Sequence, residues 1–573
     1  MCRKYFFITL IILLSFVLRF LWLDKVPNAI GGDELSYIVT AKAMTINGTD
    51  ITGKWNPLSI FIFQYPQGEH QAEIPYFLLY PFSFGSLSLF SIKTIYALMS
   101  IFSVLLIYLV TRKLLDNKTA IIAGLIFCIN PWQVFIGRTN YEMVPALFFF
   151  LVSFYILLVA KNWKILWSIP SLFLVFYSYI AVKLIFIPLV LFILIYLYFK
   201  NNKKFLKQYL IVFIFCFVLV LFFCINLLLS PGESRTSEII NLGDPEIARQ
   251  VDQVRKNSIQ TPLTNILENK FTVLSKIMAV KFINIFSFDY LFISSDQFVG
   301  FENHGLFYYI DLPFLILGIV FLASKNKKLT FLILGFIFIG ALPHLFHKVR
   351  IDNFTPHNFL IFPFLIMFIA FGLGEFINLF NNKKLKYLSA FLITIIYLIS
   401  VFSFLNTYFF QYSLKGNFDF YIRIASKYIK LANRNDQKII VYSTRSYDLF
   451  KKYLFYSGIY SRDTFNQVKE AVSAKKYVIG NVEFVSCDRT IDFSSKKHVA
   501  IYDQECGSLK KDSPYIIISG LLDGGGRYKI YNDSICKKYY LNYYPSGLLI
   551  NDFDVENLSE EKFCRTFITS RPE

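Results

Sequence analysis

The chain has 573 residues, of which 55% are hydrophobic and 17% charged, and its mean hydropathy is +0.49. A soluble protein of this length could not bury so much apolar surface, so the composition excludes an ordinary soluble enzyme and favours a membrane protein. The formal net charge is +19, but Lys and Arg stand in short clusters between apolar runs. That pattern is typical of loops at an anionic membrane surface and argues against nucleic-acid binding.

The first apolar run, residues 5–22, follows Arg3 and Lys4 and has no small-residue cleavage site behind it. We interpret it as an uncleaved helix with a cytoplasmic N-terminus. Further runs of spanning length cover 92–111, 118–135, 142–160, 164–179, 182–199, 209–229, 306–323, 329–346, 358–378 and 387–407. The sequence therefore predicts a mainly α, polytopic protein with about eleven transmembrane helices.

Charge sets the expected topology, because short cytoplasmic loops are rich in Lys and Arg. The basic loops are 112–118, 161–164, 200–207, 325–328 and 383–386. Placing them in the cytoplasm puts the longer pieces 24–91 and 230–305, and the chain after about residue 408, outside the cell (inner) membrane. Such long pieces are expected to carry function.

The chain divides into a membrane-embedded catalytic part, residues 1–410, and an extracytoplasmic α/β domain, residues 411–573. In the second part we expect helices at 418–433 and 446–456 and strands at 438–442, 476–479, 499–502, 515–519 and 528–531. Four cysteines lie there: Cys487, Cys506, Cys536 and Cys564. In an oxidising compartment they could form two disulfides, in three alternative pairings, or they could stay as free thiols.

The strongest chemical motif is GGDELSY at 31–37, just past the first helix. Asp33 and Glu34 open a helix-like stretch, 34–46, and a helix N-terminus stabilises carboxylates. Asp33 is also a good helix cap, which is the purely structural reading. The position beside the bilayer favours a functional interpretation of Asp33, since an acidic pair there can meet a lipid head group.

Two further motifs lie near the predicted outer face. Arg138, Tyr141 and Glu142 precede the fourth apolar run; Arg138 offers a fork that suits phosphate, and Glu142 is an ionisable group at the membrane edge. The alternative is an Arg138–Glu142 pair that neutralises itself. Lys183, a lone cation near the outer boundary, could bind phosphate or snorkel to the interface.

A third group is a candidate metal site. The residues concerned are Glu69, His70, Glu73, His304, His344, His347 and His357, all on predicted outer segments. The chain has no HExxH or similar close ligand spacing, so metal binding is the weaker reading. Nor does it contain a phosphate-binding G-x-x-x-x-G-K-[ST] loop or a G-x-S-x-G nucleophile motif.

The arrangement resembles the GT-C glycosyltransferases, above all the protein O-mannosyltransferases and the lipid A aminoarabinose transferases. The resemblance rests on the first-loop Asp33-Glu34 with Tyr37 shortly after, and on the segment 136–157, with Arg138 followed by an acid. Glu142 stands where the family often has Asp. The segments 282–298 with His304, and 343–373 with Arg350 and His357, continue the likeness, which covers about residues 1–410.

The resemblance implies inverting transfer of a hexose or pentose from a polyprenyl-phosphate carrier to a protein, lipid or glycan acceptor. Asp33 would be the general base, and Glu34 or Glu142 would orient it or the acceptor. The negative charge that grows on the leaving phosphate would be stabilised by Arg138, Lys183 and Arg350. The other substrate-binding residues would be Tyr37, Tyr141, His304 and His357.

The implied reaction needs no obligatory metal, although a loop-bound divalent ion stays open as an alternative. Three other functions also remain open at this stage. They are a polyprenyl-linked glycan polymerase or ligase, a transporter or flippase, and a non-catalytic scaffold whose outer domain binds a partner. The sequence shows neither repeated halves nor midplane charges, which transporters commonly have.

Overall fold

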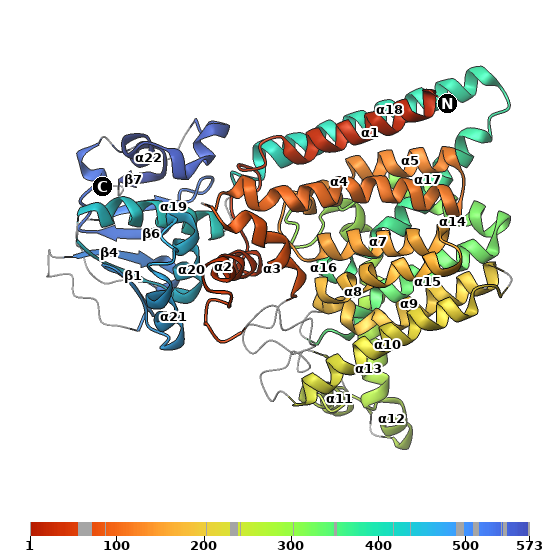
Figure 1. Cartoon of the computed structure of the whole chain (residues 1–573), viewed down its shortest axis with the longest axis horizontal. Helices are drawn as coiled ribbons and strands as arrows, with labels where there is room; N and C mark the ends of the chain where they lie inside the picture. Colours follow the sequence, from red (N-terminus) through yellow and green to blue (C-terminus); the bar gives the residue numbers. More distant parts are fainter. Residues whose placement is uncertain are drawn as a thin grey trace.

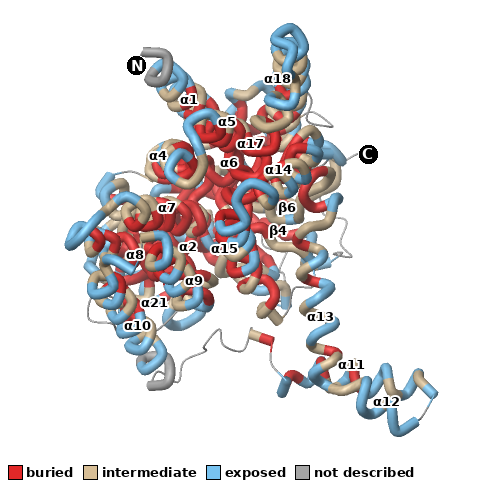
Figure 2. Tube along the Cα trace, turned by 90° about the vertical axis from the view of Figure 1, so that its right-hand side faces the viewer, coloured by how far each residue is buried: buried red, intermediate tan, exposed pale blue. Residues whose placement is uncertain are grey.

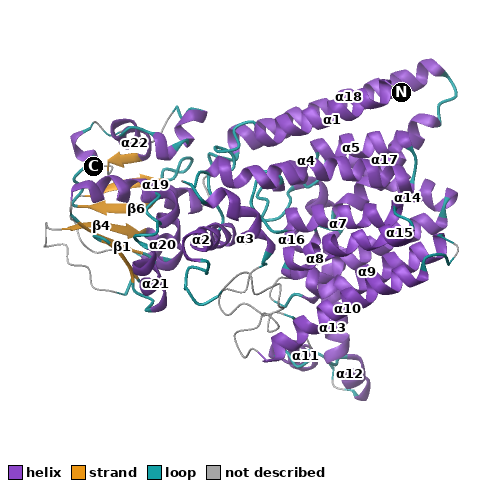
Figure 3. Cartoon of the chain, in the orientation of Figure 1, coloured by secondary structure: helices purple, strands orange, loops and turns teal. Residues whose placement is uncertain are grey.

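A computed structural model describes residues 2–55, 72–85, 87–201, 203–229, 239–240, 242–259, 261–301, 303–348, 352–415, 418–435, 437–488, 498–507, 515–539, 541 and 547–570. Most of the described chain is helical, and its strands form one sheet at one end of the molecule (Figure 3). The N-terminus lies at the end of the helical part farthest from this sheet (Figure 1). The fold is thus mainly α with an α/β layer at its C-terminal end.

The helical part is a bundle whose long helices run roughly parallel or antiparallel (Figure 1). Its members are α1 (Cys2–Phe20), α4 (Leu89–Leu114), α5 (Asn117–Ile129), α6 (Pro131–Ile136), α7 (Met143–Val159), α8 (Ser168–Ser178), α9 (Ile180–Lys200), α10 (Leu206–Leu229), α14 (Asp311–Lys325), α15 (Lys327–Phe346), α16 (Thr355–Asn358), α17 (Phe362–Asn378) and α18 (Lys383–Asn406). Apolar side chains stay exposed along the outer helices, as expected for a surface that faces lipid.

Among the described residues, six helices are long and apolar enough to cross a membrane. They are Leu89–Leu114, Ile180–Lys200, Leu206–Ile225, Lys270–Ile293, Lys327–Phe346 and Lys383–Gln411. Four shorter apolar helices accompany them, at Phe6–Phe20, Asn117–Ile129, Met143–Val159 and Phe362–Asn378. The chain is a multi-pass membrane protein, but the predicted count of about eleven spans is not confirmed.

Two differences from the predicted runs explain this outcome. The run 118–135 is divided because Pro131 has no N–H to continue α5, and Asn130 starts α6 by accepting from Gln133 N at 3.2 Å. The helix Lys270–Ile293 falls inside the piece that we predicted as an outer loop, 230–305. That piece also holds α11 (Pro245–Lys256), α12 (Pro262–Leu267) and α13 (Lys270–Ile285).

The C-terminal sheet has seven strands in the order β2-β3-β1-β4-β6-β5-β7. These are β1 (Lys438–Tyr442), β2 (Tyr477–Ile479), β3 (Val482–Val485), β4 (His498–Asp503), β5 (Tyr515–Ser519), β6 (Gly526–Tyr531) and β7 (Ile568–Ser570). β1 pairs in parallel with β3 and β4, and the remaining pairs are antiparallel. The accompanying helices are α19 (Phe418–Ala432), α20 (Ser446–Ser457), α21 (Phe465–Ser473) and α22 (Glu560–Phe567).

The expected strands in this region all occur, with ends shifted by a few residues. Of the three disulfide pairings, the structure contains Cys487–Cys506 and Cys536–Cys564. One hydrophobic cluster runs from the bundle into this region without a break. The division of the chain at residue 410 therefore stays a prediction, while the apolar packing is continuous across it.

Candidate active site

The candidate site is built on the first turn of α2 (Gly32–Asn47), which lies between the bundle and the C-terminal sheet region (Figure 1). Gly31 is the N-cap, in an extended conformation, and Asp33 and Glu34 both stand in the first turn. The helix ends at Gly48, whose φ of 73° is left-handed, a conformation that favours glycine. Packing on both sides buries most of α2, so its first turn is held rigidly.

Glu34 is the anchor of this turn. Its side chain is buried, and its two oxygens accept from Asn140 N at 2.5 Å and from Gly31 N at 2.7 Å. Burial raises the pKa of Glu34, while these two N–H groups and the Lys93 ammonium act in the opposite direction. Glu34 thus ties the turn at 31–34 to the turn before α7 (Met143–Val159).

Asp33 has the opposite environment. It is exposed, and within the described parts of the chain its carboxylate makes no hydrogen bond or ion pair. The structural reading of Asp33 as the helix cap is not what the structure shows, since Gly31 occupies that position. The Asp33 carboxylate is therefore accessible to a bound molecule from the first turn of the helix.

Tyrosines and a third acid surround the turn. Tyr37 lies one helical turn after Asp33, and burial followed by the charge of Glu142 raises its pKa well above the usual value. Burial, with the charges of Glu34 and Asp33, does the same to Tyr141. A Cβ on Gly31 would lie 2.6 Å from the Tyr141 hydroxyl, so a side chain at this position would have to displace that hydroxyl. Asp33, Glu34, Tyr37, Tyr141 and Glu142 therefore belong to one cluster.

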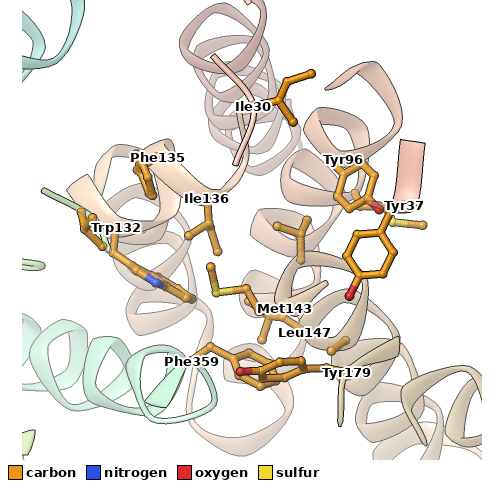
Figure 4. Packing of buried hydrophobic residues seen from close by; sticks show 14 of the residues in the cluster. Ile30, Tyr37, Tyr96, Trp132, Phe135, Ile136, Met143, Leu147, Tyr179 and Phe359 are labelled. Atoms are coloured by element: carbon orange, nitrogen blue, oxygen red, sulfur yellow. The ribbon is translucent and has the colours of Figure 1, made fainter. Parts of the chain in front are cut away.

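This cluster rests on an apolar base. Tyr37 and Tyr96 lie close together there, with Met143 and Leu147 of α7 below them (Figure 4). Tyr37 also packs edge-on against Tyr76, with ring centres 5.3 Å apart, and Tyr141 packs edge-on against Phe298 at 4.4 Å. These contacts fix the rings that line the site.

Arg138 does not point its guanidinium at the cluster. The group is fully buried, and all five of its N–H donors are directed at main-chain carbonyls of the last turn of α1 and of the turn that follows it. The accepting carbonyls, at 2.7–3.1 Å, belong to Leu18, Arg19, Leu21, Trp22 and Val26. A cation at a helix C-terminus stabilises those carbonyls. The predicted phosphate contact therefore does not fit this arrangement, because no donor of Arg138 is left for a phosphate.

Lys183 is likewise engaged. Its ammonium lies 3.0 Å from both oxygens of Glu73, and both side chains are buried. The rings of Phe176, Tyr177 and Phe223 surround it. The pair joins the segment before α3 (Ile74–Leu79) to the α8–α9 turn, where Glu73 N also donates to Tyr177 O at 3.0 Å. This geometry explains Lys183 as a buried structural cation.

The histidines are divided between two places. His304 packs on Phe404, with ring centres 6.0 Å apart, and burial lowers its pKa. His344, His347 and His357 lie near one another, with His347 and His357 ring centres 4.8 Å apart. Arg350, Glu69 and His70 lie outside the described residues. Within those that are described, no three His, Cys, Asp or Glu side chains are arranged to hold a metal ion.

The sequence reasoning missed four cations that surround the turn. Lys93, buried near the start of α4, donates to Pro27 O at 2.8 Å and acts on Glu34. The other three come from the C-terminal region. Arg423 donates to Asn28 O at 2.6 Å, Lys451 donates to Ser36 Oγ at 2.9 Å, and the charge of Glu34 acts on Lys452. Lys93 could have been found in the sequence, because it is a lone Lys at the edge of the apolar run 92–111. The other three cations could not, because their contacts join distant parts of the chain.

No family model matches the chain, and no curated protein matches it in sequence. Solved structures resemble it at low identity. An oligosaccharyltransferase from Archaeoglobus fulgidus, tethered with an acceptor peptide, has a TM-score of 0.45 and 14% identity, covering 93% of this chain and 74% of its own. Its complex with Zn and sulfate gives 0.44 and 14%, over 92% and 73%. ArnT from Cupriavidus metallidurans bound to undecaprenyl phosphate gives 0.43 and 9%, over 92% and 98%.

Proposed function

We propose that the chain is an inverting membrane glycosyltransferase that moves a sugar from a polyprenyl-phosphate carrier to a protein, lipid or glycan acceptor. The observation that carries this proposal is Asp33, an exposed carboxylate on a helix turn whose neighbour Glu34 is buried and holds that turn in place. The site would lie at the outer face of the inner membrane, with the N-terminus in the cytoplasm and the C-terminal region outside.

In the proposed reaction Asp33 accepts the proton of the acceptor hydroxyl or amine as that atom attacks the anomeric carbon. The bond from this carbon to the carrier phosphate breaks, and the phosphate leaves with the bonding electrons. A phosphate leaving group needs little protonation, so one carboxylate base is enough; glycoside hydrolysis, by contrast, usually needs an acid as well. The proposed reaction has no obligatory metal, so we expect transfer to survive treatment with EDTA; loss of transfer would support the alternative, a loop-bound divalent ion.

Glu34 and Glu142 take positioning roles in this proposal. Glu34 fixes the position of the turn that carries Asp33 by accepting hydrogen bonds from Gly31 N and Asn140 N. Glu142 lies within hydrogen-bonding reach of the Tyr37 hydroxyl, and together they would orient the acceptor. Such positioning matters because a small misplacement of a general base costs a large factor in rate.

The leaving phosphate requires positive charge. The N–H donors of Arg138 are bound to carbonyls, and the Lys183 ammonium is paired with Glu73. We therefore assign the stabilisation of the leaving phosphate to Arg350 and to His357, which follows it in the chain. Tyr141 and His304 would contact the sugar or the carrier. Arg350→Ala should then raise the KM for the carrier lipid, whereas the same substitution at Lys348, which pairs with Asp244 at 3.2 Å, should have a smaller effect.

The decisive experiment measures sugar release from a panel of radiolabelled polyprenyl-phosphate sugars by purified protein in lipid, with crude membrane acceptors added. We expect wild type to turn over one donor and Asp33→Asn to lose transfer. Asp252→Asn, which changes an equally exposed acid on α11, should stay active and is the matched control. Full activity of Asp33→Asn would contradict its role as base. Sugar movement across sealed vesicles without transfer would instead indicate a transporter.

A further inference from the structure

Residues 242–259 and 261–285 form a folded arm that leaves the bundle sideways (Figure 2). Within it Ile247 and Val251 of α11 pack against Val273 of α13. Asn269 caps α13 by accepting from Phe271 N at 2.8 Å, and Arg255 closes the loop between the helices by donating to Glu268 O at 2.7 Å. The arm therefore has a small core of its own and a defined shape.

The tip of the arm exposes large apolar side chains instead of burying them. Five of them, within thirteen consecutive positions, are 61–88% exposed: Ile259, Leu263, Ile266, Leu267 and Phe271. None of them belongs to the core that joins α11 to α13. A cluster of this kind on a folded surface marks a site of contact with another apolar phase or protein.

The direction of α13 favours contact of this apolar tip with the membrane over contact with a protein. In Figure 2 the helices α4, α7 and α9 are seen nearly end-on, whereas α13 runs across the view and carries α11 and α12 away from them. α13 is apolar enough to cross a membrane, yet it lies across the helices that would cross it. Val280 and Ile283 are also exposed, so apolar side chains are accessible along α13 as well as at the tip.

We infer that the arm lies in the plane of the bilayer, with α12 and the start of α13 inserted at the boundary between head groups and acyl chains. Amphipathic helices bind there through buried apolar side chains, with cations at the anionic head groups. Exposed cations flank the apolar tip at Lys256 and Lys270, while Lys276 pairs with Glu268 at 2.9 Å. The occupant of the apolar face is therefore the lipid bilayer, and the helix Lys270–Ile293 is an interfacial segment and not a span.

The arm also fixes the segment that leads to Arg350. Lys281 donates to His347 O, Asn353 Nδ2 donates to Asn284 O at 2.7 Å, and Asp244 pairs with Lys348 at 3.2 Å. Seating the arm in the interface would hold this segment at the level of the lipid phosphates. This consequence for transfer rests on the proposed function, whereas the seating itself does not.

The seating can be measured without any activity. A spin label is attached at Leu263→Cys, in a variant with Cys2 and Cys224 changed to Ser, and the protein is placed in nanodiscs of phosphatidylethanolamine and phosphatidylglycerol. We expect collisions with oxygen to exceed collisions with a water-soluble nickel chelate. The control label at Gln253→Cys, on the polar side of α11, should show the reverse.

Two results would overturn the inference. Greater access of the nickel chelate at position 263 than of oxygen would place the tip in water. Dipolar broadening that disappears when labelled protein is diluted with unlabelled protein would assign the face to a second copy of the chain. Because position 263 is exposed, the substitution leaves the core of the arm unchanged. Loss of transfer in the Asp33→Asn experiment has no bearing on either result.

Discussion

Glu34 offers a sharp test of how the candidate site is held. In Glu34→Gln the side chain keeps one acceptor oxygen, so one of the two N–H groups at Gly31 and Asn140 faces an NH₂ group instead. Losing one buried hydrogen bond to a charged acceptor costs about 2 kcal/mol. If the cost falls on local opening of the turn, it corresponds to about a 30-fold rise in the opening equilibrium.

Hydrogen exchange read by mass spectrometry measures this directly. Peptides covering 28–36 and 137–143 should exchange about 30-fold faster in Glu34→Gln, and faster still in Glu34→Ala, which leaves both N–H groups without an acceptor. Glu246→Gln, at the exposed first turn of α11, is the matched control and should leave both peptides unchanged. Unaltered exchange in Glu34→Gln would refute the argument that Glu34 ties the two turns together.

Two further predictions concern cations that the structure places in its framework. Arg138→Lys should lower the thermal stability of the purified protein, because one ammonium cannot reach the five carbonyls. The KM for the carrier lipid should stay unchanged. A raised KM at full stability would instead indicate that Arg138 binds the phosphate. Burial alone would raise the pKa of Glu556, but the Arg423 guanidinium outweighs it and holds that pKa below its usual value. The stability that this pair adds is present above the unfolded carboxyl pKa of about 4.3 and is lost as pH falls through the lower folded value. Melting curves of wild type and Glu556→Gln should therefore differ at pH 7 and converge in acid, whereas Glu561→Gln, in an exposed pair, should show no such trend.

Local signals in the sequence predicted much of the fold and the helix that carries Asp33 and Glu34. Apolar runs located the bundle helices, and alternating strands and helices located the α/β layer. The helix expected at 34–46 occurs as α2, Gly32–Asn47, so Asp33 and Glu34 both lie in its first turn, while their role in a site stays a prediction. These features depend on neighbouring residues, which a single sequence displays.

The roles of the charged residues could not be predicted in the same way. Lys183 meets Glu73 across 110 positions, and Lys451 meets Ser36 across 415. Arg138 reads in sequence as an unpaired fork, because its partners are main-chain carbonyls, which every residue has. The direction of α13 is also absent from its composition, since interfacial and spanning helices can share the same apolar content.

The contacts between the two ends of the chain have a consequence for biosynthesis. Asn28 O receives its hydrogen bond from Arg423, whose guanidinium is paired with Glu556, and Lys25 donates to Asn551 at 2.7 Å. Arg423 follows Asn28 by 395 positions and Asn551 follows Lys25 by 526, so the ribosome delivers these partners long after the first helix. The segment just before the Asp33 turn can therefore form these contacts only after the C-terminal sheet region has been synthesised, so a chain truncated before that region should insert into the membrane without them.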